Sequence, residues 1–393
     1  MPPTPADIAV VHGARTPIGR YQGALASAPA HRLGALVIRE AVVRAGAQLG
    51  SVDEVVLGCV GQVGPEAFNA RRAALAAGLP VRTPAYNVNR LCGSGLQAVR
   101  SAAQSLRCGT ADVIVAGGNE SMTRQPRLDY SERAPDELPG EPVIDGTVSL
   151  VTDPFGHYPM GMTGEIVADR YGISRARQDH WAAESQRRAA LAIEAGRFEA
   201  QIVPVATPEG IVERDEHPRP GTSVEKLAGL RTVFTEDGTV TAGNSAGLND
   251  GAAAVLLMRA ADVDTTPLCL LRDTAVTALE PEIMGVAPAD AIRALLRRND
   301  LTTDDLDVIE LNEAFAAQVL AVLDTLKLDP DRVNPNGGAI ALGHPIGATG
   351  AVLLLKAAHE LRRTGGRLGV VALCVGGGQG IAALIENPGA GSR

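Results

Sequence analysis

Three residues lie in glycine-rich turns where a side chain is available for chemistry. Cys92 lies in NRLCGSGLQAV, His344 in GGAIALGHPIGATG and Cys374 in ALCVGGGQG. A cysteine at a glycine turn that opens a helix faces unsatisfied N–H groups and the positive end of the helix dipole, which favours the thiolate. Cys92 is therefore a candidate nucleophile, although the same pattern also fits a small buried cysteine.

The other two turns offer the groups that a cysteine nucleophile needs. A nucleophilic thiol requires a nearby base, and His344 has few apolar neighbours in its own segment to pack against. Cys374 ends an apolar strand and precedes three glycines whose N–H groups can form an oxyanion hole. The alternatives are a structural or solvent-exposed histidine and a strand cysteine before a flexible turn.

A polar pair follows another apolar strand. Asn312 and Glu313 end the strand VIEL in the motif NEAF, so both side chains face the edge where α/β proteins form their sites. An N-cap pair for the next helix is the structural alternative.

Several other kinds of site lack their motifs. No GxGxxG follows a first strand with an acidic residue about 20 positions on, and no GxxxxGK[ST] is present, which disfavours dinucleotides and nucleoside triphosphates. Cys92, His344 and Cys374 have no standard zinc-ligand spacing, so we predict no metal site. Acyl transfer through a cysteine thioester fits these residues better.

An internal repeat relates the candidate nucleophile to the candidate base. SVDEVVLGC, NRLCGSGLQAVRSAAQSLRCG and ADVIVAGGNESM have the same plan as TTDDLDVIELNEAF, GHPIGATGAVLLLKAAHELRRTGG and RLGVVALCVGGGQG. Cys92 lies 39 positions after Asp53, and His344 lies 37 positions after Asp307. The repeat therefore predicts that Cys92 and His344 occupy equivalent turns, and that two pseudo-symmetric halves meet at one site.

The elements that position these turns alternate between short apolar strands and helices. Leu96, Val99, Ala103 and Leu106 share one face of the first helix, which we expect to end at Gly109. In the second helix the stronger apolar face holds Leu354, Ala358 and Leu361, the weaker face holds Val352, Leu355, His359 and Arg362, and Gly365 ends the helix. This pattern predicts an α/β fold with buried, largely parallel strands.

Residues 122–245 differ from both halves. The stretch from 123 to 151 is rich in Pro, Asp and Glu, which predicts an acidic excursion, that is, a long loop with little regular structure. Two amphipathic helices follow, broken near 172–174, with Ser174 as the N-cap of the second. We predict an inserted, mostly helical domain that covers the mouth of the site.

Composition narrows the class of protein. The 393 residues carry a formal charge of −9, which argues against nucleic acid or an anionic membrane as the main partner. The five cysteines are widely spaced without a CxxC pair, which favours a reducing compartment. The start has no signal-peptide pattern, and no apolar run approaches the length of a membrane span, so we expect a cytoplasmic protein.

Six motifs, in order, together resemble one family over nearly the full chain. NRLCGSGLQAV, GGNESM, TAGNSAGLNDGAAA, NEAFAAQ, GGAIALGHPIGATG and CVGGGQG are similar to those of thiolases of the acetyl-CoA acyltransferase type. The resemblance implies the five-layered αβαβα thiolase fold, made of two similar halves and a loop domain that binds coenzyme A. The expected divisions are 1–121 plus 246–268 for the N-terminal half, 122–245 for the loop domain, and 269–393 for the C-terminal half.

The resemblance also implies catalytic roles. Cys92 would carry the acyl group as a thioester, His344 would activate it, and Cys374 would be the second acid and base. Asn312 would hold a water that forms one oxyanion hole with His344. The N–H groups of Cys92 and Gly376 would form the other, and two holes suit a Claisen reaction because negative charge develops on two thioester oxygens.

The same resemblance implies contacts to coenzyme A. Arg219 matches the arginine beside the adenine nucleotide, Phe234 the aromatic residue along pantetheine, and Met160 a wall of the acyl pocket. Two departures stand out. Biosynthetic members read HMG where this chain has 159–161, with His157 two places before Pro159, and PMGMT looks more like degradative 3-ketoacyl-CoA thiolases. After TAGN the chain reads Ser245 and Ala246, so the serine hydroxyl expected at 246 is absent.

The sequence thus predicts a thiolase that cleaves a 3-oxoacyl-CoA with free CoA or runs the reverse condensation, with CoA and acyl-CoA as substrates and no prosthetic group. Ketoacyl synthases of the same superfamily are the nearest alternative, but they generally lack the second cysteine. A non-catalytic, thiolase-like protein that binds acyl-CoA or lipid is a further alternative. The resemblance suggests a homodimer or a homotetramer.

Overall fold

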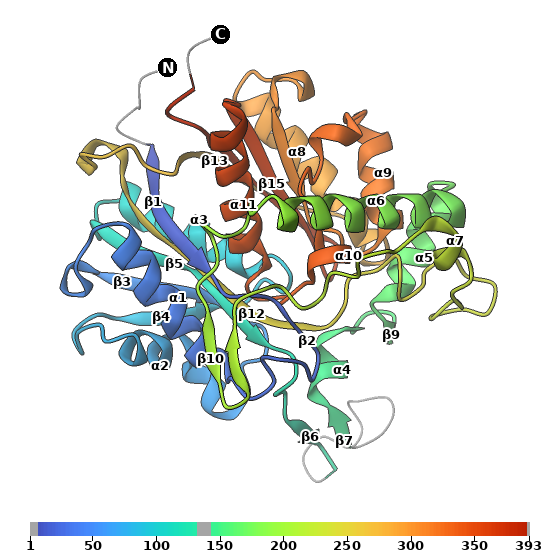
Figure 1. Cartoon of the computed structure of the whole chain (residues 1–393), viewed down its shortest axis with the longest axis horizontal. Helices are drawn as coiled ribbons and strands as arrows, with labels where there is room; N and C mark the ends of the chain where they lie inside the picture. The colour runs from blue at the N-terminus through green and yellow to red at the C-terminus, as the bar shows by residue number, and fades with distance from the viewer. Residues whose placement is uncertain (1–6, 132–142, 391–393) are drawn as a thin grey trace.

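The two repeated regions form the same sequence of strand, helix and strand (Figure 1). The computed structural model describes residues 7–131 and 143–390. The first unit holds β3 (Glu54–Gly58), α3 (Ser94–Arg107) and β5 (Val113–Ser121), and the second holds β14 (Val308–Leu311), α11 (Thr349–Thr364) and β15 (Leu368–Val375). β3 pairs in parallel with β5, as β14 does with β15.

Two aspartates make equivalent contacts in the two units. Asp53 Oδ2 accepts hydrogen bonds from the N–H groups of Asp112 and Val113 at the start of β5, at 2.8 and 2.9 Å. Asp307 Oδ2 accepts the corresponding bonds from Arg367 and Leu368 at the start of β15, at 2.7 and 3.1 Å. The register of the predicted repeat therefore agrees with the structure.

The strand order of the main sheet is nearly a palindrome, because the order outward from the centre is equivalent in the two halves: β13, β16, β15 and β14 correspond to β1, β12, β5 and β3. Within the described residues it reads β14-β15-β16-β13-β1-β12-β5-β3-β4, with β2 paired to β12. At its centre, residues 8–10 of β1 pair antiparallel with residues 269–271 of β13, so the sheet passes from one half into the other. The remaining strands are β1 (Ile8–Arg15), β2 (Gly19–Arg20), β4 (Ala85–Val88), β12 (Asn249–Arg259), β13 (Cys269–Ala278) and β16 (Gln379–Glu386).

Helices cover both faces of each half. α1 (Ala30–Arg44) and α2 (Asn69–Ala76) pack outside the N-terminal half, and α8 (Ala287–Arg298) and α9 (Ala316–Leu326) pack outside the C-terminal half. α3 and α11 contact each other between the two parts of the sheet. Three apolar clusters fill the spaces between these layers. The fold is thus α/β, with helices in outer, central and outer layers as predicted.

The two central helices approach closely at two glycines. A Cβ on Gly95 would lie 3.0 Å from the carbonyl oxygen of Gly347, and a Cβ on Gly350 would lie 2.3 Å from the backbone nitrogen of Leu96. A larger residue at either position would force the helices apart. This contact holds the turn before α3 beside the turn before α11, and these turns carry Cys92 and His344.

The predicted helix faces are only partly right. α3 buries Leu96, Val99, Ala103 and Leu106, and it ends before Gly109, which has φ of +68°. In α11 the face predicted to be weaker is buried at Val352 and Leu355, because this helix lies in the central layer, whereas His359 is half-buried and Arg362 is exposed. Lys356 is even fully buried there, where its Nζ donates to Glu310 Oε2 at 2.7 Å and to the carbonyl of Gly337 at 2.6 Å.

The inserted segment 122–245 contains fewer helical residues than we predicted. Ser174 Oγ accepts from the N–H of Arg177 at 3.3 Å, as expected of an N-cap. Part of the acidic excursion, 132–142, lies outside the described residues. The described helices of the inserted segment are α4 (Gly146–Leu150), α5 (Gly161–Arg170), α6 (Arg175–Glu194) and α7 (Val224–Ala228). Its strands form three hairpins: β6 (Arg127–Asp129) with β7 (Val143–Asp145), β8 (Thr152–Asp153) with β9 (Tyr158–Pro159), and β10 (Val205–Thr207) with β11 (Gly210–Val212). None of the helices that the structure describes is long and apolar enough to cross a membrane.

Candidate active site

A cavity of about 450 Å³ brings together residues from both halves and from the inserted segment. Two of the ten predicted site residues, Asn312 and Cys374, lie behind its wall, Asn312 beside His344 and Cys374 in the apolar cluster that includes Met160 and Phe234. The other eight line the cavity itself: Cys92, Met160, Arg219, Phe234, Ser245, Ala246, His344 and Gly376.

A tight turn between β4 and α3 presents Cys92. Leu91, just before it, has a φ of +44°, a left-handed conformation that is unfavourable for a leucine. Ser94 braces the turn, because its Oγ donates to the carbonyl of Leu91 at 2.6 Å and accepts from the N–H of Arg90 at 2.9 Å. The strained backbone thus holds the thiol at the cavity wall.

The environment of Cys92 corrects one prediction. Burial raises the pKa of its thiol to about 11, even though hydrogen bonds from the N–H groups of Cys92 and Gly376 lower it. Desolvation of the anion therefore outweighs the helix start that we expected to favour the thiolate. The thiol needs a base, while the two N–H groups already point at the reacting sulfur.

His344 is buried, which keeps its imidazole neutral and so able to act as a base. The residue is 6% exposed, and its backbone N–H donates a hydrogen bond to Asn249 Oδ1 on β12 at 2.8 Å. Burial lowers the pKa of its imidazole to about 4. Its Nε2 lies 3.5 Å from the amide nitrogen of Asn312, which follows β14. The imidazole is therefore uncharged at neutral pH and able to accept a proton.

Cys374 lies near the end of β15 and is fully buried. Burial raises the pKa of the Cys374 thiol far above its ordinary range, and the negative charge that Cys92 carries when it is ionised raises it further. Cys374 is thus a neutral proton donor in the resting protein. Gly376 follows in the turn to β16, as the CVGGGQG motif predicted.

The inserted segment supplies the walls away from Cys92. A Cβ on Gly161 would lie 2.0 Å from the ring of Phe234, so the glycine leaves room for this aromatic side chain beside Met160. Glu165 on α5 fixes the loop that carries Phe234 by accepting hydrogen bonds from the N–H groups of Thr239 and Val240, at 2.8 and 2.9 Å. His157 is exposed and does not line the cavity.

A buried ion pair fixes the segment that holds Arg219. Arg15 on β1 donates to both carboxylate oxygens of Asp215, at 2.7 and 2.9 Å, and both side chains are 1% exposed. Arg219 itself is exposed at the cavity, and the buried His217 lines it. Sequence reasoning singled out neither His217 nor Asp215, although both lie beside Arg219 in RDEHPRPG.

The structure shows how the chain differs from the family pattern at Ser245 and Ala246, after TAGN. Ser245 Oγ donates to the carbonyl of Thr241 at 2.7 Å, so its hydroxyl is used within its own loop. Ala246 donates its N–H to the carbonyl of Ala314 at 3.0 Å and lines the cavity without a polar side chain. Ser245 therefore does not replace the missing hydroxyl at 246.

A fully buried carboxylate, which sequence reasoning missed, joins the two halves behind the site. Glu120 accepts hydrogen bonds from the N–H groups of Val60, Gly61 and Gly347, at 2.9, 3.1 and 3.0 Å. Burial raises the pKa of Glu120 to about 7. Its place in GGNESM, at the end of a strand, was the available signal.

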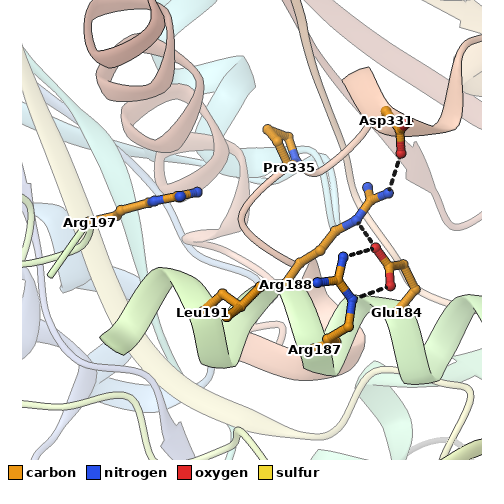
Figure 2. Close-up of a pocket in the computed structure, with 7 residues that line it drawn as sticks. All are labelled: Glu184, Arg187, Arg188, Leu191, Arg197, Asp331 and Pro335. Atoms are coloured by element: carbon orange, nitrogen blue, oxygen red, sulfur yellow. Dashed lines mark hydrogen bonds and ion pairs between the residues drawn. The ribbon is translucent and has the colours of Figure 1, made fainter. Parts of the chain in front are cut away.

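A smaller pocket, of about 150 Å³, lies elsewhere, between α6 and the segment 331–335 (Figure 2). Its arginines have partners: Glu184 binds Arg187 and Arg188, each at 2.6 Å, and Arg188 binds Asp331 at 3.2 Å. It contains no cysteine or histidine. The cavity at Cys92, in contrast, is lined by both a cysteine and a histidine.

The low pKa of His344 predicts an unusual pH profile. The base form persists down to about pH 4, so acylation of Cys92 should not lose its base between pH 7 and pH 5. A histidine of ordinary pKa, about 6.5, would instead become mostly protonated by about pH 5. Single-turnover acylation measured from about pH 7.5 to about pH 4.5 tests this expectation.

Unfolding must be followed in the same samples. His217, His344 and His359 all have a pKa near 4 in the folded chain. Their contribution to stability is complete above about pH 6.5 and is lost as the pH falls towards 4, because the unfolded chain then binds protons more readily. Circular dichroism at each pH separates the two effects, and a midpoint near 6.5 in folded protein would contradict the prediction.

Comparisons with known proteins agree with this geometry. Residues 8–261 match a family model described as the thiolase N-terminal domain, and residues 265–387 match the thiolase C-terminal domain. The chain is 48% identical to the beta-ketothiolase BktB of Cupriavidus necator and 45% identical to an acetyl-CoA acetyltransferase of Chromobacterium violaceum. These alignments cover 97% of this chain in both cases, and 99% and 100% of the relatives.

Solved structures are similar over the same length. The crystal structure of the Bacillus anthracis acetyl-CoA acetyltransferase has a TM-score of 0.93 and 43% identity, covering 97% of this chain and 98% of that one. The human mitochondrial 3-ketoacyl-CoA thiolase in complex with CoA has a TM-score of 0.92 and 39% identity, with the same coverage.

Proposed function

The chain belongs to the thiolase family, and from this premise we propose which residues carry its reaction. As a thiolase it is an acyl-CoA:acetyl-CoA acyltransferase, which cleaves a 3-oxoacyl-CoA with CoA or condenses two acyl-CoA molecules in reverse. One observation supports the assignment of the residues best: Cys92 and His344 line one cavity, and the N–H groups of Cys92 and Gly376 are bound to the Cys92 sulfur.

The first half of cleavage forms the acyl-enzyme. His344 takes the thiol proton of Cys92, and the sulfur attacks the C3 carbonyl of the 3-oxoacyl-CoA. The C2–C3 bond breaks, the acyl group stays on Cys92, and C2 of the departing acetyl-CoA takes the proton of Cys374. The neutral Cys374 thiol suits this donation.

The second half transfers the acyl group to CoA. The Cys374 thiolate takes the proton of the incoming CoA thiol, and the CoA sulfur attacks the thioester on Cys92. The bond to Cys92 breaks, and the protonated His344 returns a proton to its sulfur. The two half-reactions share one site, so we expect ping-pong kinetics.

Two sets of donors serve the two oxyanions. The N–H groups of Cys92 and Gly376 stabilise the oxygen of the tetrahedral intermediate at Cys92, which the hydrogen bonds to this sulfur support. Protonated His344, with a water held by Asn312, stabilises the enolate oxygen of acetyl-CoA. Asn312 is fully buried, and among the described residues its Oδ1 has no hydrogen-bond partner, which leaves it able to bind such a water.

We also propose that 122–245 is the loop domain that binds coenzyme A, between an N-terminal half of 1–121 plus 246–268 and a C-terminal half of 269–393. In this assignment Arg219 contacts the nucleotide, Phe234 lies along pantetheine and Met160 forms a wall of the acyl pocket. The position of all three at the cavity supports it, as does the CoA complex of the human relative. CoA and acyl-CoA act as substrates, and the mechanism needs no prosthetic group.

Restoring a hydroxyl at 246 tests the pantetheine contact. We expect Ala246→Ser to lower the KM for CoA about 2- to 10-fold with little change in kcat, because one added hydrogen bond contributes about 0.5–1.5 kcal/mol. Steady-state kinetics at varied CoA measure this effect. Ala206→Ser adds a hydroxyl at an exposed position of strand β10 and serves as the control. An unchanged KM in Ala246→Ser would exclude a pantetheine contact at this position.

The wider setting is also a proposal. We propose a cytoplasmic homodimer or homotetramer that acts in fatty acid metabolism, including β-oxidation. PMGMT and the human 3-ketoacyl-CoA thiolase support a degradative role. β4 supports oligomerisation, since it ends the described sheet and carries the exposed Tyr86.

Acyl trapping tests the function directly. After incubation with acetyl-CoA, peptide mass spectrometry should find one acetyl group, on Cys92. Rates of thiolysis on acetoacetyl-CoA and on longer 3-oxoacyl-CoA substrates then define the acyl preference. Absence of the adduct in protein that is folded would overturn the proposed role of Cys92.

A further inference from the structure

Thr349, the first residue of α11, contacts the Nδ1 side of the His344 imidazole. Thr349 Oγ1 lies 2.7 Å from His344 Nδ1, and both residues are buried, at 2% and 6% exposure. The same oxygen lies 2.9 Å from the carbonyl oxygen of Pro345, one helical turn before it. The hydroxyl therefore has two close partners within five residues of the chain.

Counting protons assigns the direction of both bonds. A carbonyl oxygen only accepts hydrogen bonds, so the single proton of Thr349 goes to Pro345, in the bond that threonine commonly makes to the preceding turn. Its oxygen then faces Nδ1 with a lone pair. Two lone pairs at 2.7 Å would repel each other, so Nδ1 must carry the proton.

The other nitrogen of a neutral imidazole is then bare. Nε2 lies 3.5 Å from the amide nitrogen of Asn312, which is a donor, and a lone pair on Nε2 matches it. His344 also lines the cavity that holds Cys92. A bare Nε2 is the form that a base needs to take the thiol proton.

We propose that Thr349 is a positioning residue that keeps the proton of neutral His344 on Nδ1, so that every proton exchanged with substrate or Cys92 passes through Nε2. This inference rests on the proposed role of His344 as the base. The Thr349 oxygen accepts from Nδ1–H before and after the transfer. Once Nε2 has taken the Cys92 proton, it is the donor that faces the enolate oxygen.

The low exposure of the pair explains why the orientation matters. Without the Thr349 oxygen, Nδ1–H would be a buried donor with no acceptor, which is an unfavourable state. The imidazole would then shift towards the Nε2–H tautomer or rotate away. Either change removes the lone pair from the cavity.

Nitrogen NMR of the wild-type protein tests the tautomer without any substitution. In protein labelled with ¹⁵N-histidine, His344 should show a protonated Nδ1 and an unprotonated Nε2 at neutral pH, since the two nitrogens resonate far apart. The spectrum of His344→Ala identifies its signals among those of the seven histidines. A protonated Nε2 in the resting enzyme would overturn the proposal.

Three variants test the consequence for catalysis. We expect Thr349→Val to slow the single-turnover acylation of Cys92 about 10- to 100-fold, the usual effect of losing a partner that orients a functional histidine, with the affinity for acetyl-CoA nearly unchanged. Thr349→Ser retains the hydroxyl and should restore most of the rate. Thr364→Val is the matched control, because Thr364 makes the same kind of bond, to the carbonyl of Glu360 at 2.9 Å, at the other end of α11.

The outcomes separate this inference from the function on which it rests. If His344→Ala acylates at the wild-type rate, the role of His344 as base fails. If His344→Ala is inactive while Thr349→Val acylates at the wild-type rate, only the role of Thr349 fails. A loss of rate that Thr349→Ser does not restore would also count against the hydroxyl.

Discussion

Replacement of Cys92 by alanine is expected to lower thiolysis by about 10⁴-fold or more and to abolish the acetyl adduct. The reaction depends on a covalent bond to this sulfur, and Cys92 is the one cysteine among the described residues that line the cavity. Steady-state thiolysis of acetoacetyl-CoA and mass spectrometry of the intact protein measure the two effects. Burial of CoA by the inserted segment should persist, so CoA binding is retained.

Cys108 offers the matched control for this substitution. It is an exposed, free cysteine at the end of α3, the helix that Cys92 precedes. Cys108→Ala should keep both the adduct and the wild-type rate. If Cys92→Ala retains more than a small fraction of the activity, the covalent mechanism is wrong.

The second large effect concerns Cys374. We expect Cys374→Ala to form the acetyl adduct on Cys92 and to lose turnover by about 10²- to 10⁴-fold, the usual range for a general acid and base. A thiol of ordinary pKa leaves as a thiolate near neutral pH, so transfer of the acetyl group to Cys92 can proceed without an acid. Protonation or deprotonation of the C2 carbon needs a positioned group.

Comparing the half-reactions isolates this role. Rapid-quench measurement of the adduct reports acylation, and thiolysis of acetoacetyl-CoA reports the full cycle. Cys269→Ala, on strand β13 of the same sheet, removes another fully buried strand thiol that does not line the cavity. Normal turnover in Cys374→Ala would remove this residue from the mechanism, whereas a lost adduct would assign it to acylation instead.

The sequence predicted an α/β fold of two similar halves because its strands and helices follow local patterns that repeat. Periodicity identified the two central helices, and the register of the repeat related Cys92 to His344 before any spatial information. The equivalent contacts of Asp53 and Asp307 support the pairing of the two units. The domain boundaries and the individual catalytic roles stay predictions.

The pKa values of the site residues could not be predicted from sequence patterns. A helix start lowers the pKa of a thiol, but burial raises it, and the balance depends on which elements cover the residue. At Cys92 burial dominates. The same limit applies to Glu120, whose three donors come from segments that are far apart in sequence.

Long-range ion pairs were also beyond the reach of sequence patterns. Arg15 and Asp215 are 200 positions apart, and each alone is indistinguishable from a surface charge in the sequence. Together they fix the segment that carries Arg219. Lys356 is comparable, since a lysine in a helical repeat is normally placed on the solvent side.

The palindromic strand order has a consequence for how such a site can arise. A symmetric dimer of one half would carry the same side chain in both turns, giving two cysteines or two histidines across its axis. Within a single chain the two turns can be changed independently, and here one holds the nucleophile and the other its base. Joining two copies of the half in one polypeptide therefore removes the constraint that symmetry would otherwise impose on acid–base chemistry.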